Sequence, residues 1–125
     1  MFLYMFPLWG NGSGAWLRAL AAEMVKDGND VAIVAPEHRT LPGIKHYLVV
    51  PPQMGVFVGN PELPDIKKYE EMSGVELGKI YSTYVNTTLN AVKDFQPEIV
   101  HAFHTAFLPG VARIAKIMYG ILERQ

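Results

Sequence analysis

A glycine-rich stretch near the N-terminus, PLWGNGSG, is the part of this chain whose composition most directly predicts chemistry. It places Gly10, Gly12 and Gly14 between an apolar run at 1–6 and an amphipathic segment, which is the setting of a strand-to-helix turn. A turn with little side-chain bulk lets backbone N–H groups and the following helix N-terminus face an anionic ligand, usually a phosphate. We therefore predict that Gly10, Gly12, Ser13 and Gly14 form a substrate or phosphate loop. The alternative is that the glycines only permit a positive φ in a turn.

The same stretch fits G-x-G-x-x-A, a variant of the dinucleotide-binding fingerprint, when it is read from Gly10 to Ala15. In that interpretation Glu37, just after the next apolar run, would bind a ribose hydroxyl. In the fingerprint, however, the first glycine lies at the end of the strand, whereas here residues 7–9 come between them. A longer and wider turn would not hold a pyrophosphate in the usual tight manner, which argues against this interpretation.

His101 and His104 lie at the end of a predicted strand over 99–103. Ligands of open parallel sheets bind outside the carboxyl ends of the strands, and the glycine-rich loop opens onto the same edge. With the strands ordered 3-2-1-4, the first and fourth are neighbours at the topological switch point. An imidazole there can hydrogen-bond a sugar hydroxyl or a phosphate, or transfer a proton. We predict both histidines as catalytic residues; the alternative for His101 is a core histidine bonded to a backbone carbonyl.

Apolar runs and helical spacing predict the order β-α-β-β-α-β-α, which is typical of a parallel α/β sheet. The strands are expected at 1–6, 31–35, 47–50 and 99–103, and the last helix at 107–118.

The helix signals are local. Ser13 is the expected N-cap of the first helix, and Gly28 follows its end. Ser73 and Glu76 form an expected capping box for the second helix, which Pro97 stops. The aromatic residues Trp16, Tyr81 and Tyr84 are interpreted as core or half-buried side chains.

Residues 51–65 contain four of the nine prolines and are expected to form a long irregular loop. Asn60, Glu62 and Asp65 in this loop could recognise a polyol; a plain surface loop is the alternative.

Composition excludes several classes of function. A net charge of −1 and a pI of about 6.4 argue against a nucleic-acid partner. The absence of cysteine excludes disulfides, thiolate zinc sites and a cysteine nucleophile, and it fits a cytoplasmic location. The apolar N-terminus lacks the basic residues of a signal peptide, and no G-x-S-x-G or G-K-[ST] motif is present. H-x-x-H without a nearby carboxylate is a weak metal motif, so we expect neither a metal nor a cofactor.

Two segments resemble glycosyltransferases of the GT-B fold, most closely family four, the retaining group 1 set. In that family a Gly-rich loop is followed by a helix with L-A-x-x-L and by G-H-E-V before the second strand. This chain has LAAEM at Leu20–Met24 and GNDV at Gly28–Val31. Its segment Gln96–His104, QPEIVHAFH, is similar to the family's P-D-[VI]-[VI]-H-x-H. The resemblance covers nearly the whole chain in order and spacing.

The resemblance carries over to individual positions. It implies that Gly12 and Gly14 lie near the donor phosphates and the acceptor. His101 matches the first histidine of the family's segment, and His104 lies one place beyond the usual second histidine. Asn29 replaces the histidine of G-H-E-V.

The family's enzymes have two domains: the N-terminal one binds mainly the acceptor, and the C-terminal one binds the nucleotide-sugar donor without a metal. We therefore expect residues 1–125 to be one Rossmann-like, acceptor-side domain of a retaining glycosyltransferase of hexosyltransferase type, truncated before the later strands and inactive alone. The expected partners are a sugar or lipid-linked acceptor and a donor-binding domain or partner chain. We expect a cytoplasmic location, peripheral to the membrane, and self-association through the open edge of the fourth strand.

Two other functions remain open at this point. The chain could be a free-standing, non-catalytic α/β subunit that needs a partner to complete its site. It could also be a dinucleotide-binding Rossmann domain, against which the lengthened first loop argues.

Overall fold

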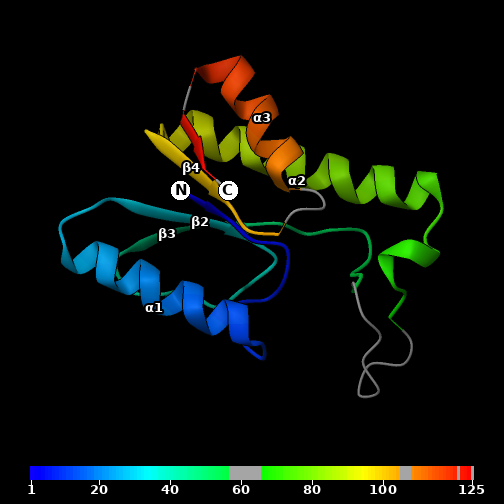
Figure 1. The fold of residues 1–125 in the computed structure, drawn as a ribbon, viewed down its shortest axis with the longest axis horizontal. Coiled ribbons are helices and arrows are strands. Elements are labelled where there is room, and N and C mark those ends of the chain that lie inside the picture. The colour runs from blue at the N-terminus through cyan, green and yellow to red at the C-terminus, as the bar shows by residue number, and fades with distance from the viewer. Residues whose placement is uncertain (57–65, 105–107, 121, 125) are drawn as a thin grey trace.

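In the computed structural model, the chain forms a three-layer α/β arrangement whose middle layer is a parallel sheet (Figure 1). The structure describes residues 1–56, 66–104, 108–120 and 122–124, the last of these for the backbone only. The strands are β1 (Phe2–Leu3), β2 (Val31–Ala35), β3 (Ile44–Leu48), β4 (Ile99–Ala102) and β5 (Leu122–Arg124). The helices are α1 (Gly12–Lys26), the short 3-10 helix η1 (Tyr69–Glu71), α2 (Gly74–Phe95) and α3 (Leu108–Tyr119).

The sheet has the order β3-β2-β1-β4-β5, and every pairing in it is parallel. This confirms the predicted α/β class and the expected 3-2-1-4 order of the first four strands. Strand β1 is central: Phe2 pairs with Ile33 of β2 on one side and with His101 of β4 on the other. The loop after β1 therefore leaves the sheet at its topological switch point.

Side chains of β1 and of the two residues after it alternate between two hydrophobic clusters. Phe2 and Tyr4 pack under α1, whereas Leu3 and Met5 pack against α2 and α3 on the opposite face. Figure 1 shows α1 on one side of the sheet and α2 with α3 on the other. Because both faces of β1 are covered, the continuous apolar run at 1–6 is explained.

Three strands have boundaries that differ from the prediction, and the smallest difference is that β4 ends at Ala102 instead of at 103. Ladder pairing of β1 covers only Phe2–Leu3, although a backbone hydrogen bond from Tyr4 to Val34 extends it by one residue. The third strand occupies Ile44–Leu48 instead of 47–50. Strand β3 is at the edge of the sheet and only half-buried, so its polar residues were not recognised by a search for continuous apolar runs.

A fifth strand corrects the prediction that the outer side of β4 is an open edge. Strand β5 pairs in parallel with β4, with Val100 opposite position 123. The side of β4 that was expected to be an open edge is therefore covered, and the sheet ends at β3 and β5. Strand β5 has only three residues, and a strand this short carries no detectable sequence periodicity.

Local signals placed most helix ends correctly. The Ser73–Glu76 capping box is present in α2, with both reciprocal hydrogen bonds formed. Gly28 follows α1 with a φ of 88°, the left-handed conformation that favours glycine. The N-cap of α1 is Asn11, however, and not Ser13.

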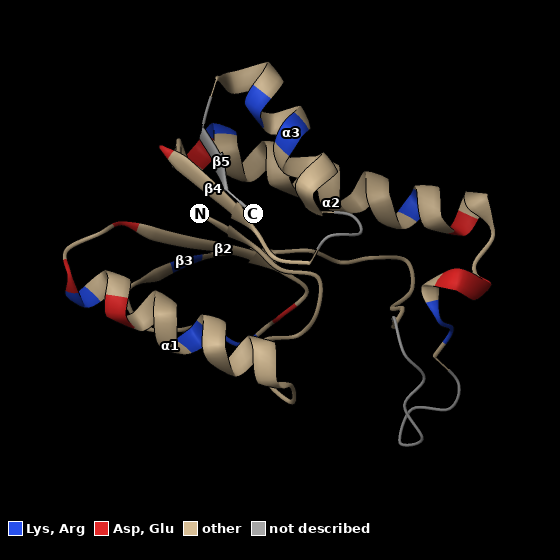
Figure 2. Cartoon of the chain, in the orientation of Figure 1, with Lys and Arg blue, Asp and Glu red and all other residues tan. Residues whose placement is uncertain are grey.

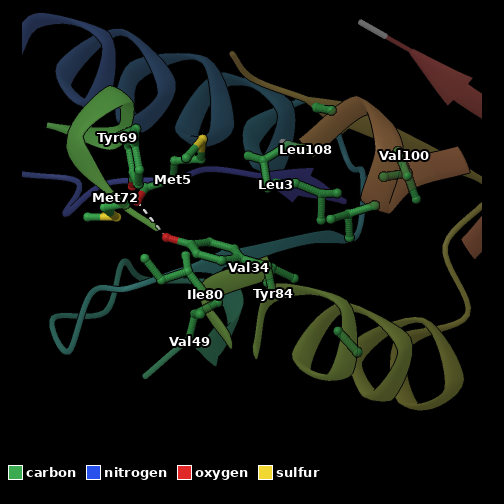
Figure 3. Close-up of a cluster of buried hydrophobic side chains, with 14 residues drawn as sticks. Leu3, Met5, Val34, Val49, Tyr69, Met72, Ile80, Tyr84, Val100 and Leu108 are labelled. Carbon is green, nitrogen blue, oxygen red and sulfur yellow. Dashed lines mark hydrogen bonds between the residues drawn. The ribbon is translucent and has the colours of Figure 1, made fainter. Parts of the chain in front are cut away.

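Tyr84 of α2 connects the α2 layer to the central strand. Its side chain is almost fully buried, and its hydroxyl donates a hydrogen bond of 2.6 Å to the carbonyl of Met5. Figure 3 shows Tyr84 pointing toward Met5 among the buried residues of this layer. The bond fixes the backbone just before the glycine-rich loop.

The predicted polyol contacts Asn60, Glu62 and Asp65 lie outside the described residues. Within the described part of the chain, no helix is long and apolar enough to cross a membrane.

Replacing Tyr84 with phenylalanine should lower the free energy of unfolding by about 1–3 kcal/mol, because the buried Met5 carbonyl loses its donor. Urea denaturation measures the change. Tyr119→Phe is the matched control, since that ring is 43% exposed and its hydroxyl deletion should change stability by less than about 0.5 kcal/mol. Equal effects of the two substitutions would contradict this role of Tyr84.

Candidate functional site

The side chain of Asn11 organises the glycine-rich loop. Its Oδ1 accepts hydrogen bonds from the backbone N–H of Gly14 at 2.7 Å and from the hydroxyl of Tyr4 at 2.5 Å. Its Nδ2 donates to the carbonyl of Pro7 at 2.7 Å. Ser13 adds a contact of 2.5 Å between its hydroxyl and that of Tyr4. One carboxamide thus joins the loop, the first turn of α1 and the residue after β1.

The three glycines of the loop have different reasons to be glycine. Gly10 has a φ of 89°, which L side chains rarely adopt. Gly14 is buried, and a Cβ there would lie 2.4 Å from the carbonyl oxygen of Leu8. Gly12 has neither constraint: it is exposed, and its Cβ position has no heavy atom within 4 Å. Backbone conformation and packing therefore explain why positions 10 and 14 are glycine. At Gly12 neither reason applies, and the absence of a side chain leaves the N-terminus of α1 uncovered.

The loop itself and the first turn of α1 contribute no charged side chain. Residues 1–17 contain no Asp, Glu, Lys or Arg, and Figure 2 shows the start of α1 without red or blue. The first turn of α2, in contrast, carries Glu76. Because an acidic residue there would compensate the positive end of the helix dipole, its absence leaves the N-terminus of α1 able to attract an external anion.

His104 lies beside this loop. Its φ is 66°, uncommon for a residue other than glycine, and it turns the chain after β4. The imidazole centroid is 5.1 Å from the ring of Tyr4 and 5.0 Å from that of Phe6. Burial lowers the pKa of His104, which favours the neutral imidazole. Tyr4 also contacts Asn11 and Ser13, so His104 and the glycine-rich loop pack against the same side chain. The loop after β1 and the end of β4 therefore lie at the same edge of the sheet, as the strand order predicts.

His101 occupies a different place. It lies one pairing step from the carboxyl end of β4, opposite Phe2, and its ring is 5.7 Å from that of Phe2. It lines a cavity of about 180 Å³ between α1 and β4, together with Leu20 and Met24. Burial and the nearby N-terminal ammonium lower the pKa of His101. Its ring also lies 5.0 Å from that of Phe103, whose centroid is 6.5 Å from that of His104, so His101 is connected to the loop side of the junction through Phe103.

Two aromatic residues next to the loop were not recognised as site residues. Trp16 was expected to be a core or half-buried residue, but it is 57% exposed. Its ring lies 5.7 Å from that of Phe103, which stands where the glycosyltransferase segment has its second histidine. Helical spacing could have found Trp16, because it lies at the margin of the buried face defined by Leu17 and Ala21.

Glu37 is engaged within the protein. Its carboxylate accepts hydrogen bonds from the backbone N–H groups of Leu8 and Arg39, each at 3.0 Å. Burial acts to raise the pKa of Glu37, but these bonds, a further one from Trp9 and the charge of Arg39 lower it. The carboxylate that would bind ribose in a dinucleotide site instead holds the loop after β1 against the loop after β2.

No group of three or more His, Asp or Glu side chains in the described part of the chain could hold a metal ion. No protein-family model matches this chain, and no curated protein matches its sequence. The glycosyltransferase resemblance therefore depends on the two motifs quoted above and on their positions in the fold.

Gly14→Ala should lower the free energy of unfolding by about 1–3 kcal/mol, because the new methyl group meets the Leu8 carbonyl and the Asn11 side chain. Gly12→Ala is the matched control and should change stability by less than about 0.5 kcal/mol. Chemical denaturation of both variants distinguishes the two positions. A tolerated Gly14→Ala would contradict the close packing of the loop.

Stability should fall as the pH is lowered below about 6.5, the ordinary pKa of histidine. Burial lowers the pKa of His46, His101 and His104 in the folded chain, so the unfolded chain binds protons first and unfolding is favoured. His46 contributes because its Nε2 accepts the backbone N–H of Leu41 at 2.9 Å.

Unfolding free energies measured at pH 7.5 and pH 5.5 test this expectation. His46→Gln should reduce the difference between the two values, whereas the same change at exposed His38 serves as the control. Stability that rises toward pH 5.5 would contradict the argument.

Proposed function

We propose that this chain is the acceptor-binding domain of a retaining glycosyltransferase, which moves a sugar from a nucleotide-sugar donor to a sugar or lipid-linked acceptor. The observation that carries the proposal is the meeting of the glycine-rich loop and His104 at the β1–β4 junction, through their shared neighbour Tyr4. This junction is where ligands bind in open α/β sheets. The resemblance to the GT-B fold supports the same assignment.

The exposed backbone of the loop has the chemistry that a leaving diphosphate needs. The amides of Gly12 and Ser13 are the first two of α1, and the first turn of this helix contains no acidic side chain. The bonds of Asn11 to the Gly14 amide and to Tyr4, and the contact of Tyr4 with the Ser13 hydroxyl, fix the residues on either side of these amides. Fixed donors aimed at developing negative charge lower the barrier of a transfer reaction, because they do not have to reorganise.

His104 suits the positioning of a hydroxyl group. Burial lowers the pKa of His104, which favours the neutral ring, and a neutral imidazole can both donate and accept hydrogen bonds. A hydroxyl that is oriented before reaction loses less entropy in the transition state. His101 remains a catalytic prediction from the sequence, but its position under α1 fits a supporting role better.

Trp16 offers a surface for a sugar ring. It is a large aromatic side chain, 57% exposed, on the first turns of α1 and in contact with Phe103. An indole combines a wide apolar face with one hydrogen-bond donor, which matches a sugar's apolar C–H face and hydroxyl rim. The donor, by resemblance, binds a second domain, and we propose that the present chain alone does not transfer sugar.

Amide NMR of the ¹⁵N-labelled chain tests the assignment. The probes are methyl glycosides of glucose, mannose, galactose and N-acetylglucosamine, the diphosphates UDP and GDP, and NADH. At least one glycoside and one diphosphate should shift the amides of Gly12 and Ser13 and the indole of Trp16. His104→Ala should weaken glycoside binding about tenfold, the loss of about 1.4 kcal/mol.

His38→Ala, at an exposed position away from this junction, is the control and should bind like the unaltered chain. Saturation of the loop amides by NADH, with no response to any glycoside or diphosphate, would support a dinucleotide-binding domain and overturn the proposal. Binding of none of the probes would also overturn it. Sugar transfer by the isolated chain would contradict the placement of the donor on a second domain.

A further inference from the structure

Three side chains beside the glycine-rich loop take no part in the function proposed above. The guanidinium carbon of Arg18 lies 4.7 Å from the centroid of the Trp9 ring, and that of Arg39 lies 5.3 Å from it. We call Trp9, Arg18 and Arg39 the arginine–tryptophan cluster. Its members come from the loop after β1, from α1 and from the loop after β2. Because both loops follow the carboxyl ends of neighbouring strands, the cluster lies at the ligand-binding edge of the sheet.

The cluster concentrates positive charge. Because the guanidinium groups of Arg18 and Arg39 both lie near the Trp9 ring, their separation cannot exceed the sum of their two distances to its centroid. The two positive charges therefore repel each other. The indole attracts each of them, but no carboxylate compensates them closely. Among the described residues, neither guanidinium has a carboxylate oxygen within 4.0 Å.

Glu37 is the acidic residue of this region, and its charge is already engaged by backbone donors. Both of its oxygens accept N–H groups, from Leu8 and from Arg39. The carboxylate thus positions the loop that carries Trp9. Its negative charge is stabilised by these backbone N–H groups as well as by the charge of Arg39. The cluster keeps an excess of positive charge.

Arg18 carries an unsatisfied donor. Its Nε is buried from solvent and has no hydrogen-bond partner in the part of the chain that the structure describes. A buried donor without an acceptor is costly, and guanidinium groups pair best with oxyanions. An anionic oxygen bound beside Trp9 would satisfy this donor and would reduce the repulsion between Arg18 and Arg39.

We infer that the arginine–tryptophan cluster binds a phosphate group of the acceptor, so that the acceptor of this chain is a phosphorylated sugar or a phospholipid-linked one. The inference rests on the function proposed above and adds the class of acceptor. A tetrahedral phosphate presents oxygens in several directions, which suits two guanidinium groups that approach from different elements.

The cluster and the sugar surface lie on different sides of α1. Successive residues of an α-helix are separated by about 100°, so Arg18 projects about 200° around the axis from Trp16. Trp16 contacts Phe103 after β4, whereas Arg18 contacts Trp9 in the loop after β1. An acceptor that reaches both surfaces must extend across the glycine-rich loop, with its phosphate distant from the reacting hydroxyl.

Titration of the ¹⁵N-labelled chain with sodium phosphate tests the inference, with sodium chloride at matched ionic strength as the reference. Phosphate should shift the indole N–H signal of Trp9 in a saturable manner, and chloride should not. Arg39→Gln should weaken phosphate binding at least tenfold; this side chain is exposed, so the variant is expected to fold. Arg18→Gln should do the same, and Arg18→Lys should restore little because lysine lacks the planar fork.

Lys26→Gln is the matched control, since it removes one exposed positive charge from the same helix and should leave phosphate binding unchanged. Glucose 6-phosphate and vesicles of phosphatidic acid in phosphatidylcholine distinguish the two sources of the phosphate. Tighter binding of the sugar phosphate supports a soluble acceptor, and tighter binding of the vesicles supports a lipid-linked one.

An equal response to chloride, or unchanged phosphate binding in both glutamine variants, would overturn the inference. Neutral glycosides are titrated in parallel, so that the two proposals fail separately. If glycosides still shift Trp16 while phosphate leaves Trp9 unaffected, only the acceptor class is wrong. If no glycoside binds, the proposed function is wrong, and the inference about the acceptor, which rests on it, is wrong as well.

Discussion

The carboxamide of Asn11 is the constraint on which the edge of the sheet depends. It accepts from Gly14 and Tyr4 and donates to Pro7, so the turn, the helix and the end of the central strand have one common hydrogen-bonding partner. The loop is therefore packed on itself and does not need a ligand to be ordered. Gly14 is required by this packing, because the carbonyl of Leu8 fills the space of a side chain. What remains exposed is the backbone at Gly12 and Ser13.

Around this loop the fold places two different surfaces. On the side of β4, Phe103 and His104 meet Tyr4 and Trp16, and aromatic rings form most of the contacts. On the side of β2, Glu37 holds the backbone of the loop while Arg18 and Arg39 approach Trp9. One surface is neutral and aromatic, and the other is cationic. A sugar carrying a distant phosphate has the complementary distribution of groups.

Much of the fold could be predicted from the sequence because its signals are local. The apolar run of β2, the Ser73–Glu76 capping box and the glycine after α1 depend on neighbouring residues, and all three are confirmed. Edge strand β3 was misplaced, because a half-buried strand lacks a continuous apolar run. Strand β5 was missed, because pairing with β4 and not its own pattern makes it a strand.

The sequence by itself determined the α/β class and the glycine-rich turn, since hydrophobic periodicity and backbone freedom are properties of the local chain. Only the tertiary structure decided which side chains share a site. It selected Asn11 over Ser13 as the cap, brought His104 to the loop and left His101 under α1. It also gathered Trp9, Arg18 and Arg39 from three elements. The reason is physical: the direction of each side chain follows from pleat, helix phase and packing between distant segments, and no local pattern encodes these together.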